Sequence, residues 1–126
     1  MGIGETRKIK ITKVDGSKLT IKEENFGEEF TIDNIFDYME ECQVGYAGSV
    51  HKIKSQDLVK RGPYWIDIDD KKYVVVDTSG DSIKFAFIPS SPSEKEGVLE
   101  VKKKNLVDYL KSHEIGLPRD SSIFPW

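Results

Sequence analysis

The chain has 126 residues, a formal net charge of −3, and 33% charged against 37% hydrophobic residues. This length predicts one domain, spanning residues 1–126, whose core needs neither a metal nor a disulfide. The single cysteine, Cys42, excludes an internal disulfide and a cysteine-based zinc site. Many charges of both signs are typical of a soluble protein and hint at a thermophile.

No targeting segment is expected at the start of the chain. Residues 1–5 contain neither the basic region nor the apolar region of a signal peptide. The longest apolar run covers about five residues, far fewer than the roughly 20 that cross a bilayer. We therefore expect a cytoplasmic protein that has no membrane partner, and none of its motifs indicates a cofactor.

The first third of the chain predicts three strands followed by a helix. The strands are expected over residues 6–14, 18–23 and 29–32. In each of them apolar residues alternate with polar ones. Asp15-Gly16 is a strong hairpin signal, because glycine tolerates the positive φ of a tight turn. The helix is expected over about residues 34–42, with Asp33 as its N-cap.

The middle of the chain predicts four strands and one short helix. The strands are expected over residues 49–54, 64–69, 72–77 and 82–89. The helix is expected over residues 57–61, with Ser55 as its cap, because Gly62-Pro63 ends it. The strand over residues 72–77 is the most apolar, so we place it at the centre of the sheet.

The last third predicts one strand, one helix and two irregular segments. Residues 90–97 are polar and contain Pro92, which indicates a flexible loop. A strand over residues 98–102 and a helix over residues 103–114 follow. Residues 117–126 lack any period, and we expect an extended, partly apolar tail that docks on the domain.

One short pattern occurs three times in the chain. An apolar residue at the end of a strand is followed five and six positions later by an apolar pair. The three cases are Phe30 with Ile35-Phe36, Ile53 with Leu58-Val59, and Val101 with Leu106-Val107. The first and third lie in longer matching stretches of hairpin, strand and helix. They indicate an internal pseudo-repeat around a shorter central unit; the alternative is coincidence between two ordinary amphipathic helices.

Together these elements predict an α+β fold that is mainly antiparallel. About seven or eight short strands form a bent sheet or a small barrel, with two short helices at its edge. The chain shows no alternation of strand and helix that would indicate a parallel sheet.

The charges are unevenly distributed along the chain. Residues 23–41 contain eight acids and no lysine or arginine. Without them, 14 acids remain against 19 bases, a formal charge of +5 for the rest of the chain. The acidic segment is either a solvated strand-and-helix face or a surface for a basic partner.

A basic and aromatic stretch in the middle of the chain suggests nucleic-acid binding. Lysine and arginine neutralise phosphates, and an exposed tryptophan or tyrosine can stack on a base. Trp65 lies opposite the inward-facing Ile66 and Ile68 of the expected strand, which would expose its indole. The candidate nucleic-acid-binding residues are Tyr46, Lys52, Lys54, Lys60, Arg61, Trp65, Lys102 and Lys104. Alternatively, Trp65 packs under the C-terminal tail and the lysines only increase solubility.

Other candidate sites are weaker. Glu100 and Lys102 share a strand face after the acids Asp77 and Asp81, an arrangement that some metal-dependent nucleases use. The alternative is that these charges are the solvent-facing positions of an ordinary strand.

Three aspartates and two histidines are the remaining candidates for a metal site or a catalytic site. Asp67 and Asp69 share a face of the expected strand and Asp70 opens a turn, but their spacing matches no calcium loop. His51 and His113 have no second ligand at helical spacing. We therefore predict no catalytic residue and no metal site.

The sequence favours a small non-enzymatic module that binds nucleic acid through the basic and aromatic stretch. The alternative is a protein–protein adaptor or a homo-oligomeric accessory protein that uses the acidic segment and the tail. A metal-dependent nuclease based on Glu100 and Lys102 comes third.

Overall fold

The computed structural model describes residues 6–24, 28–53 and 66–118. Its strands are β1 (Thr6–Asp15), β2 (Lys18–Glu23), β3 (Glu29–Ile32), β4 (Ile66–Ile68), β5 (Lys71–Asp77), β6 (Ser82–Ile88), β7 (Val98–Lys102) and β8 (Ile115–Pro118). Its helices are α1 (Ile35–Glu41) and α3 (Leu106–Ser112), with the 3₁₀ helices η1 (Val50–Lys52) and η2 (Lys103–Asn105). The predicted helix over residues 57–61, its cap and the last eight residues of the predicted tail, 119–126, lie outside the described residues.

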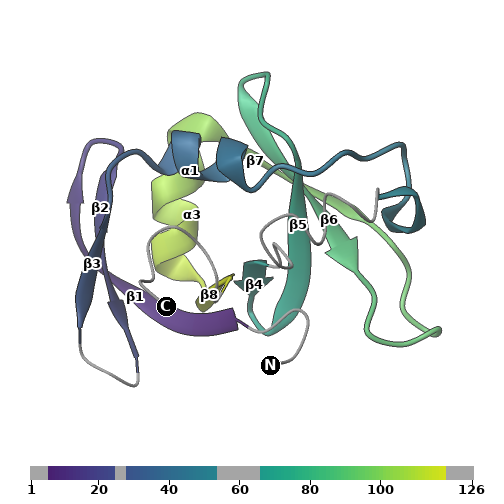
Figure 1. The fold of residues 1–126 in the computed structure, drawn as a ribbon, viewed down its shortest axis with the longest axis horizontal. Helices are drawn as coiled ribbons and strands as arrows, with labels where there is room; N and C mark the ends of the chain where they lie inside the picture. The colour runs from purple at the N-terminus through teal and green to yellow at the C-terminus, as the bar shows by residue number, and fades with distance from the viewer. Residues whose placement is uncertain (1–5, 25–27, 54–65, 119–126) are drawn as a thin grey trace.

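The strands form one eight-stranded sheet in the order β3-β2-β1-β8-β4-β5-β6-β7. Every neighbouring pair is antiparallel, and β3 and β7 are the two edges. The predicted α+β class with a bent antiparallel sheet and two short helices is therefore confirmed, and the sheet is not closed into a barrel. Figure 1 shows β1–β3 on one side and β5–β6 on the other, with α3 between them.

Two hairpins depend on backbone with positive φ. Gly16 joins β1 to β2 with φ 62°, as the sequence predicts. Asp69 and Asp70 join β4 to β5 with φ 51° and 65°. Two central residues with positive φ define the turn that matches the twist of a hairpin, and aspartate tolerates it better than most residues. Strand β4 therefore ends at Ile68, one residue earlier than expected.

The N-cap of α1 is Asn34, so the prediction of Asp33 is wrong. The Asn34 side-chain oxygen accepts hydrogen bonds from the backbone N–H groups of Phe36 at 2.9 Å and of Asp37 at 3.2 Å. Asn34 is extended, with φ −148° and ψ 114°, which is the usual geometry of a capping residue. Asp33 is exposed one position earlier, where its side chain is not the cap.

The segment expected to be a strand over residues 49–54 contains the 3₁₀ helix η1 instead. The backbone N–H of Lys52 bonds to the Ser49 carbonyl at 3.0 Å, and that of Ile53 bonds to the Val50 carbonyl at 3.3 Å. Val50 and Ile53 are three residues apart, and this spacing places two side chains on one side of a 3₁₀ turn. A period of three was therefore mistaken for strand alternation. The predicted helix over residues 103–114 similarly begins as η2 and ends at Ser112.

Strand β8 overturns the prediction that residues 117 and 118 begin an extended tail. β8 pairs with β1 on one side and with β4 on the other, so it lies in the middle of the sheet. Ile115 and Leu117 are 3% and 2% exposed. β5, expected at the centre, instead lies between β4 and β6.

The two predicted repeat units correspond to two similar halves of the sheet. In one half β1, β2 and β3 are consecutive antiparallel neighbours, and α1 follows β3. In the other half β5, β6 and β7 are arranged in the same way, and η2 and α3 follow β7. The order of elements in the first and third predicted junctions is therefore confirmed. A gene duplication remains a prediction.

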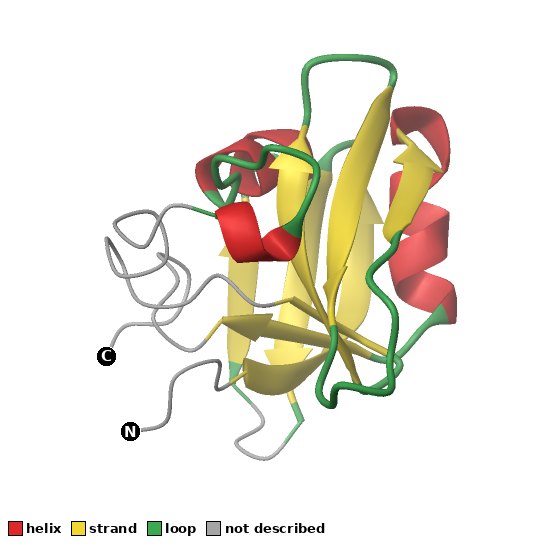
Figure 2. Ribbon diagram, turned by 90° about the vertical axis from the view of Figure 1, so that its right-hand side faces the viewer, coloured by secondary structure: helices red, strands yellow, loops and turns green. Residues whose placement is uncertain are grey.

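The sheet is covered on both sides of its β5–β7 half. Helix α3 lies on one side, whereas η1 lies on the other (Figure 2). One continuous core fills these layers, and it includes Leu106 and Leu110 of α3 and Ile35 and Met39 of α1. Among the described residues, none of the helices has the length and hydropathy that crossing a bilayer requires.

We predict that Asn34→Ala lowers the free energy of unfolding by about 1 kcal/mol, because two backbone N–H groups of α1 lose their acceptor. Asp33→Ala is the matched control and should cost clearly less. Urea denaturation of both variants and the wild type measures the difference. Equal losses for the two variants would contradict the assignment of the cap.

Candidate functional site

The structure describes half of the residues predicted to bind nucleic acid. The other four lie outside the described residues: Lys54, Lys60, Arg61 and Trp65. Tyr46 is half-buried against the core, whereas Lys52 in η1 is exposed. Lys102 and Lys104 are exposed where β7 passes into η2.

The three candidate lysines that the structure describes lie near opposite ends of β6. Lys102 pairs with Ser82, the first residue of β6. Lys52 belongs to η1, whose Val50 lines a groove together with Ile88, the last residue of β6. A seven-residue strand is roughly 20 Å long. Lys102 and Lys104 therefore form one small group, and Lys52 stands apart from it.

Lys84 separates the carboxylates considered for metal-dependent catalysis. The register places Lys84 between Asp77 of β5 and Glu100 of β7. Its Nζ atom lies 3.9 Å from Oδ2 of Asp77. A lysine between two carboxylates opposes a metal ion there, because it repels the cation that they would share. Across residues 6–24, 28–53 and 66–118, no group of three or more His, Cys, Asp or Glu side chains could hold a metal.

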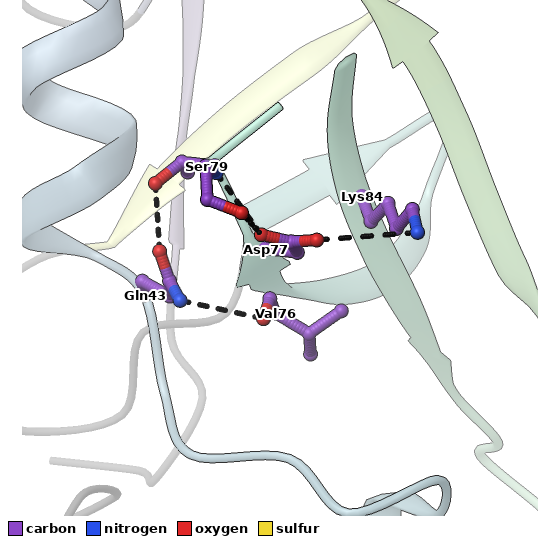
Figure 3. Close-up of polar contacts among 6 residues, drawn as sticks. Gln43, Val76, Asp77, Ser79 and Lys84 are labelled. Atoms are coloured by element: carbon purple, nitrogen blue, oxygen red, sulfur yellow. Dashed lines mark hydrogen bonds and ion pairs between the residues drawn. The ribbon is translucent and has the colours of Figure 1, made fainter. Parts of the chain in front are cut away.

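Asp77 instead organises the turn between β5 and β6 (Figure 3). Its Oδ1 atom accepts hydrogen bonds from the Ser79 backbone N–H at 3.0 Å and the Ser79 hydroxyl at 2.7 Å. These bonds, helped by Lys84, hold the pKa of Asp77 below its ordinary value. Gln43 joins the same turn to the end of α1, because its Oε1 atom accepts a hydrogen bond from the Thr78 hydroxyl at 2.7 Å. The role of Asp77 is thus structural.

The three aspartates considered for cation binding have separate partners. Asp67 lies on β4 with an oxygen 3.8 Å from Nζ of Lys72. Asp70 lies 3.6 Å from Nζ of Lys8. Asp69 turns toward His113, and its Oδ2 atom lies 2.7 Å from Nδ1 of that histidine. The carboxylates therefore do not share one ligand.

The acidic segment does not form a single surface. Glu23 is 3% exposed, with Oε2 3.6 Å from Nη1 of Arg7. Asp33, Asp37 and Glu41 instead line a hollow of about 310 Å³ beside α1. The carboxylates of the segment are thus divided between a buried ion pair and an exposed surface near the helix.

Four partly buried rings form two contacting pairs that we together call the aromatic row: Tyr73, Phe87, Tyr109 and His113. Tyr73 and Phe87 are register partners on β5 and β6, with ring centres 5.6 Å apart. Tyr109 and His113 lie on and just after α3, with ring centres 4.1 Å apart and planes tilted by 33°. Tyr73 also contacts the buried Phe85 edge to face at 6.5 Å, and it has an electrostatic effect on Tyr109 of α3.

Electrostatic interactions link the aromatic row to the β4–β5 turn. Hydrogen bonds from His113 and from the Glu114 backbone N–H lower the pKa of Asp69. Burial raises the pKa of Tyr73, and the negative charge of Asp69 raises it further. Burial also raises the pKa of Tyr109, with smaller effects from Tyr73 and Asp69. Both phenols are therefore neutral at physiological pH, and each can present a flat, uncharged ring.

A hollow of about 310 Å³ lies at the sheet end of the aromatic row. Its lining residues are Lys71, Tyr73, Phe87, Gly97, Val98 and Leu99. Nζ of Lys71 lies 5.9 Å from the centre of the Phe87 ring, a geometry that allows a cation–π interaction. The hollow thus combines a positive charge with two partly exposed ring faces.

A larger groove of about 780 Å³ lies where η1 meets the loop after β6. Val50, Ile53, Ile88 and Pro89 supply apolar surface to it. Glu96 crosses from the loop to η1, where its Oε1 atom accepts a hydrogen bond from the Val50 backbone N–H at 2.6 Å. The loop over residues 90–97, which the sequence predicts to be flexible, is therefore hydrogen-bonded to η1. Its flexibility stays a prediction.

Sequence reasoning missed the aromatic row because its members come from three separate segments. One signal could have found Tyr73 and Phe87. A regular hairpin centred on Gly80 would pair residues whose numbers add to 160, which brings those two rings together on adjacent strands. The observed register keeps this sum from Lys72 to Val75 and shifts by one residue at Asp77, next to the turn. The contact between His113 and Asp69 has no such local signal, since it depends on how α3 packs beside β4.

We predict that His113→Phe raises the pKa of Asp69 toward its ordinary value, because the ring against Tyr109 is kept but the donor to Asp69 is lost. The folded pKa of Asp69 is depressed, so the pair stabilises the fold above the unfolded pKa of about 3.9. That contribution disappears as the pH falls through the folded pKa. NMR titration of the Asp69 carboxyl carbon measures the change, with Asp77 as the internal control. An unchanged Asp69 titration would contradict the assignment.

Comparison of the chain with protein-family models, with curated proteins and with solved structures found no match. The aromatic row and the basic residues at the end of β7 are therefore the features from which a function can be proposed.

Proposed function

We propose that the protein is a non-enzymatic binding module that takes single-stranded nucleic acid on the aromatic row. The observation that carries the proposal is the pair of partly buried rings of Tyr73 and Phe87, 5.6 Å apart on neighbouring strands, which line a hollow together with Lys71. Unstacked bases bind to such rings on the surface of a sheet, and a nearby lysine can neutralise a phosphate.

The surrounding charges support weak binding without sequence preference. Lys71 is the cation beside the two rings, and Asp69 is a carboxylate close to the same row. Lysine is a point charge and not a two-pronged donor, so it adds little sequence discrimination. Stacking is tolerant of sequence because every base has a flat face. We expect dissociation constants in the range of roughly 1–100 μM at low salt, typical of non-specific contacts.

The basic residues predicted from the sequence are the second part of this proposal. Lys102 and Lys104 are exposed at the end of β7. The register places Lys102 on the face of Lys84, opposite to Phe87, so a strand bound on the aromatic row would reach it by passing around the β7 edge. A cytoplasmic location is proposed with this function.

A protein–protein adaptor is the second candidate function. The hollow beside α1, where Asp33, Asp37 and Glu41 gather around Tyr38, is the observation that favours it. A basic peptide would fit the charge of that surface. The nuclease alternative has less support, because Lys84 lies between Asp77 and Glu100.

Two substitutions at one position test the stacking proposal. Phe87→Leu keeps apolar bulk but removes the ring, whereas Phe87→Tyr keeps the ring. We predict that Phe87→Leu weakens binding at least about fivefold, because one stacked base contributes roughly 1–3 kcal/mol. Phe87→Tyr should bind like the wild type. Fluorescence anisotropy with a labelled single strand of roughly 12 nucleotides, DNA and RNA in turn, measures both.

Lysine variants then locate the phosphate contacts. Lys71→Ala should weaken binding and reduce the salt slope by about one. A Lys102→Ala, Lys104→Ala double variant reports on the end of β7. Wild-type binding weaker than roughly 100 μM to both nucleic acids would contradict the proposed function. If Phe87→Leu and Phe87→Tyr bind with equal affinity and only the double variant binds more weakly, the binding site lies outside the aromatic row.

A further inference from the structure

The edge strand β7 presents a row of outward-pointing backbone groups. The Phe87 N–H bonds to the Gly97 carbonyl, and the Lys103 N–H bonds to the Asp81 carbonyl, each at 2.8 Å. These two bonds lie at the two ends of the β6–β7 register, and antiparallel hydrogen-bonded pairs alternate along it. The odd-numbered residues of β7 therefore bond to β6. The backbone N–H and C=O groups of the even-numbered residues point away from the sheet: Val98, Glu100 and Lys102.

No described residue pairs with this outer row, and β7 is the longer of the two edge strands. β7 has five residues and carries Val98, whose 52% exposure is high for a large hydrophobic residue. β3, the other edge, has only four residues and begins with exposed Glu29. A longer edge offers more backbone groups to another strand than a short one, and its charges, Glu100 and Lys102 on β7, restrict which strand can pair with it.

The charges on β7 match a second copy of the same strand. If two antiparallel copies are centred on Val101, then Glu100 of each copy lies opposite Lys102 of the other. This register joins even-numbered residues to even-numbered residues, so the outward N–H and C=O groups meet their partners. Centring on Glu100 instead would oppose two carboxylates, which is unfavourable. Among the described residues, none forms an ion pair with Glu100 in the single chain, so its carboxylate is available.

We propose that two copies of this chain associate through antiparallel pairing of β7, with the two-fold axis at Val101. The interface is self-complementary, with two Glu100–Lys102 pairs and the backbone bonds between them. Side chains at positions 100 and 102 lie on the same face as Lys84, away from the buried Val101. The paired sheets form one continuous sheet across the dimer.

This arrangement has a geometric consequence for the hollow at the aromatic row. An axis perpendicular to the sheet keeps the two copies facing the same way. The hollow touches Val98 and Leu99 of β7, so both hollows would lie on one face of the dimer, close to the axis. The inference does not rest on nucleic-acid binding, because it follows from the edge and its charges alone.

Sedimentation velocity tests the pairing with charge reversals at the edge. In this register only Glu100, Val101 and Lys102 of each β7 face one another, because Val98 and Leu99 face Lys104 and Lys103 of η2. The interface is therefore small, and we expect the wild-type dimer to form at roughly 10–100 μM. Glu100→Lys and Lys102→Glu should each weaken the dimer at least about tenfold, because like charges then face each other twice. The double variant Glu100→Lys, Lys102→Glu should dimerise like the wild type.

An equimolar mixture of the two single variants gives the decisive result. One variant carries two lysines and the other two glutamates at the paired positions, so the mixture should form a heterodimer. Lys111→Glu on the exposed surface of α3 is the matched control for a charge reversal elsewhere and should leave the dimer unchanged. Circular dichroism checks that each variant is folded.

Three outcomes would overturn the proposal. The first is a wild-type protein that stays monomeric up to about 500 μM. The second is a dimer that the single reversals leave intact, which would place the contact on another surface. The third is a mixture of the single variants that remains monomeric although both are folded.

Discussion

The pairing of β8 with both β1 and β4 is the interaction on which the rest of the structure depends. Each half of the sheet is built from neighbours in sequence, and β8 is the strand that joins β1 to β4. Gly116 pairs with Lys8 on one side and with Asp67 on the other. Ile115 and Leu117 bring buried side chains to the same strand. Without β8 the sheet would be divided into the three strands β1–β3 and the four strands β4–β7, each with an incomplete core.

The same pairing positions the aromatic row. The backbone of Asp69 donates to the Glu114 carbonyl at 2.9 Å, just before β8 begins, and its side chain accepts from the Glu114 N–H. His113 is therefore held over the β4–β5 turn by the residue that leads into the central strand. The rings of Tyr73 and Phe87 come from the hairpin on the other side of that turn. The pairing of β8, which is far from β5 in sequence, thus places His113 beside the turn that leads to Tyr73 and Phe87.

Local features of the fold could be predicted from the sequence, and long-range ones could not. β2 and β3 have the expected bounds, because alternation and the Asp15-Gly16 turn act over a few residues. β8 shows no alternation of polar and apolar residues, because Ile115, Gly116 and Leu117 are all buried. A strand was expected where η1 forms, because the three-residue spacing of Val50 and Ile53 is compatible with a 3₁₀ turn and also with an irregular strand. The aromatic row escaped prediction for the same reason as β8: its contacts join segments that only the folded sheet brings together.

Gly116 offers the most direct measurement of whether β8 joins the two halves. In an NMR spectrum of the folded chain, its backbone protons should show cross-strand nuclear Overhauser effects to Lys8 and to Asp67. Both sets are required, because each reports one side of the central strand. We expect both sets to be observed. Contacts to Lys8 alone, to Asp67 alone or to neither would contradict it, since the sheet would then be divided between its halves.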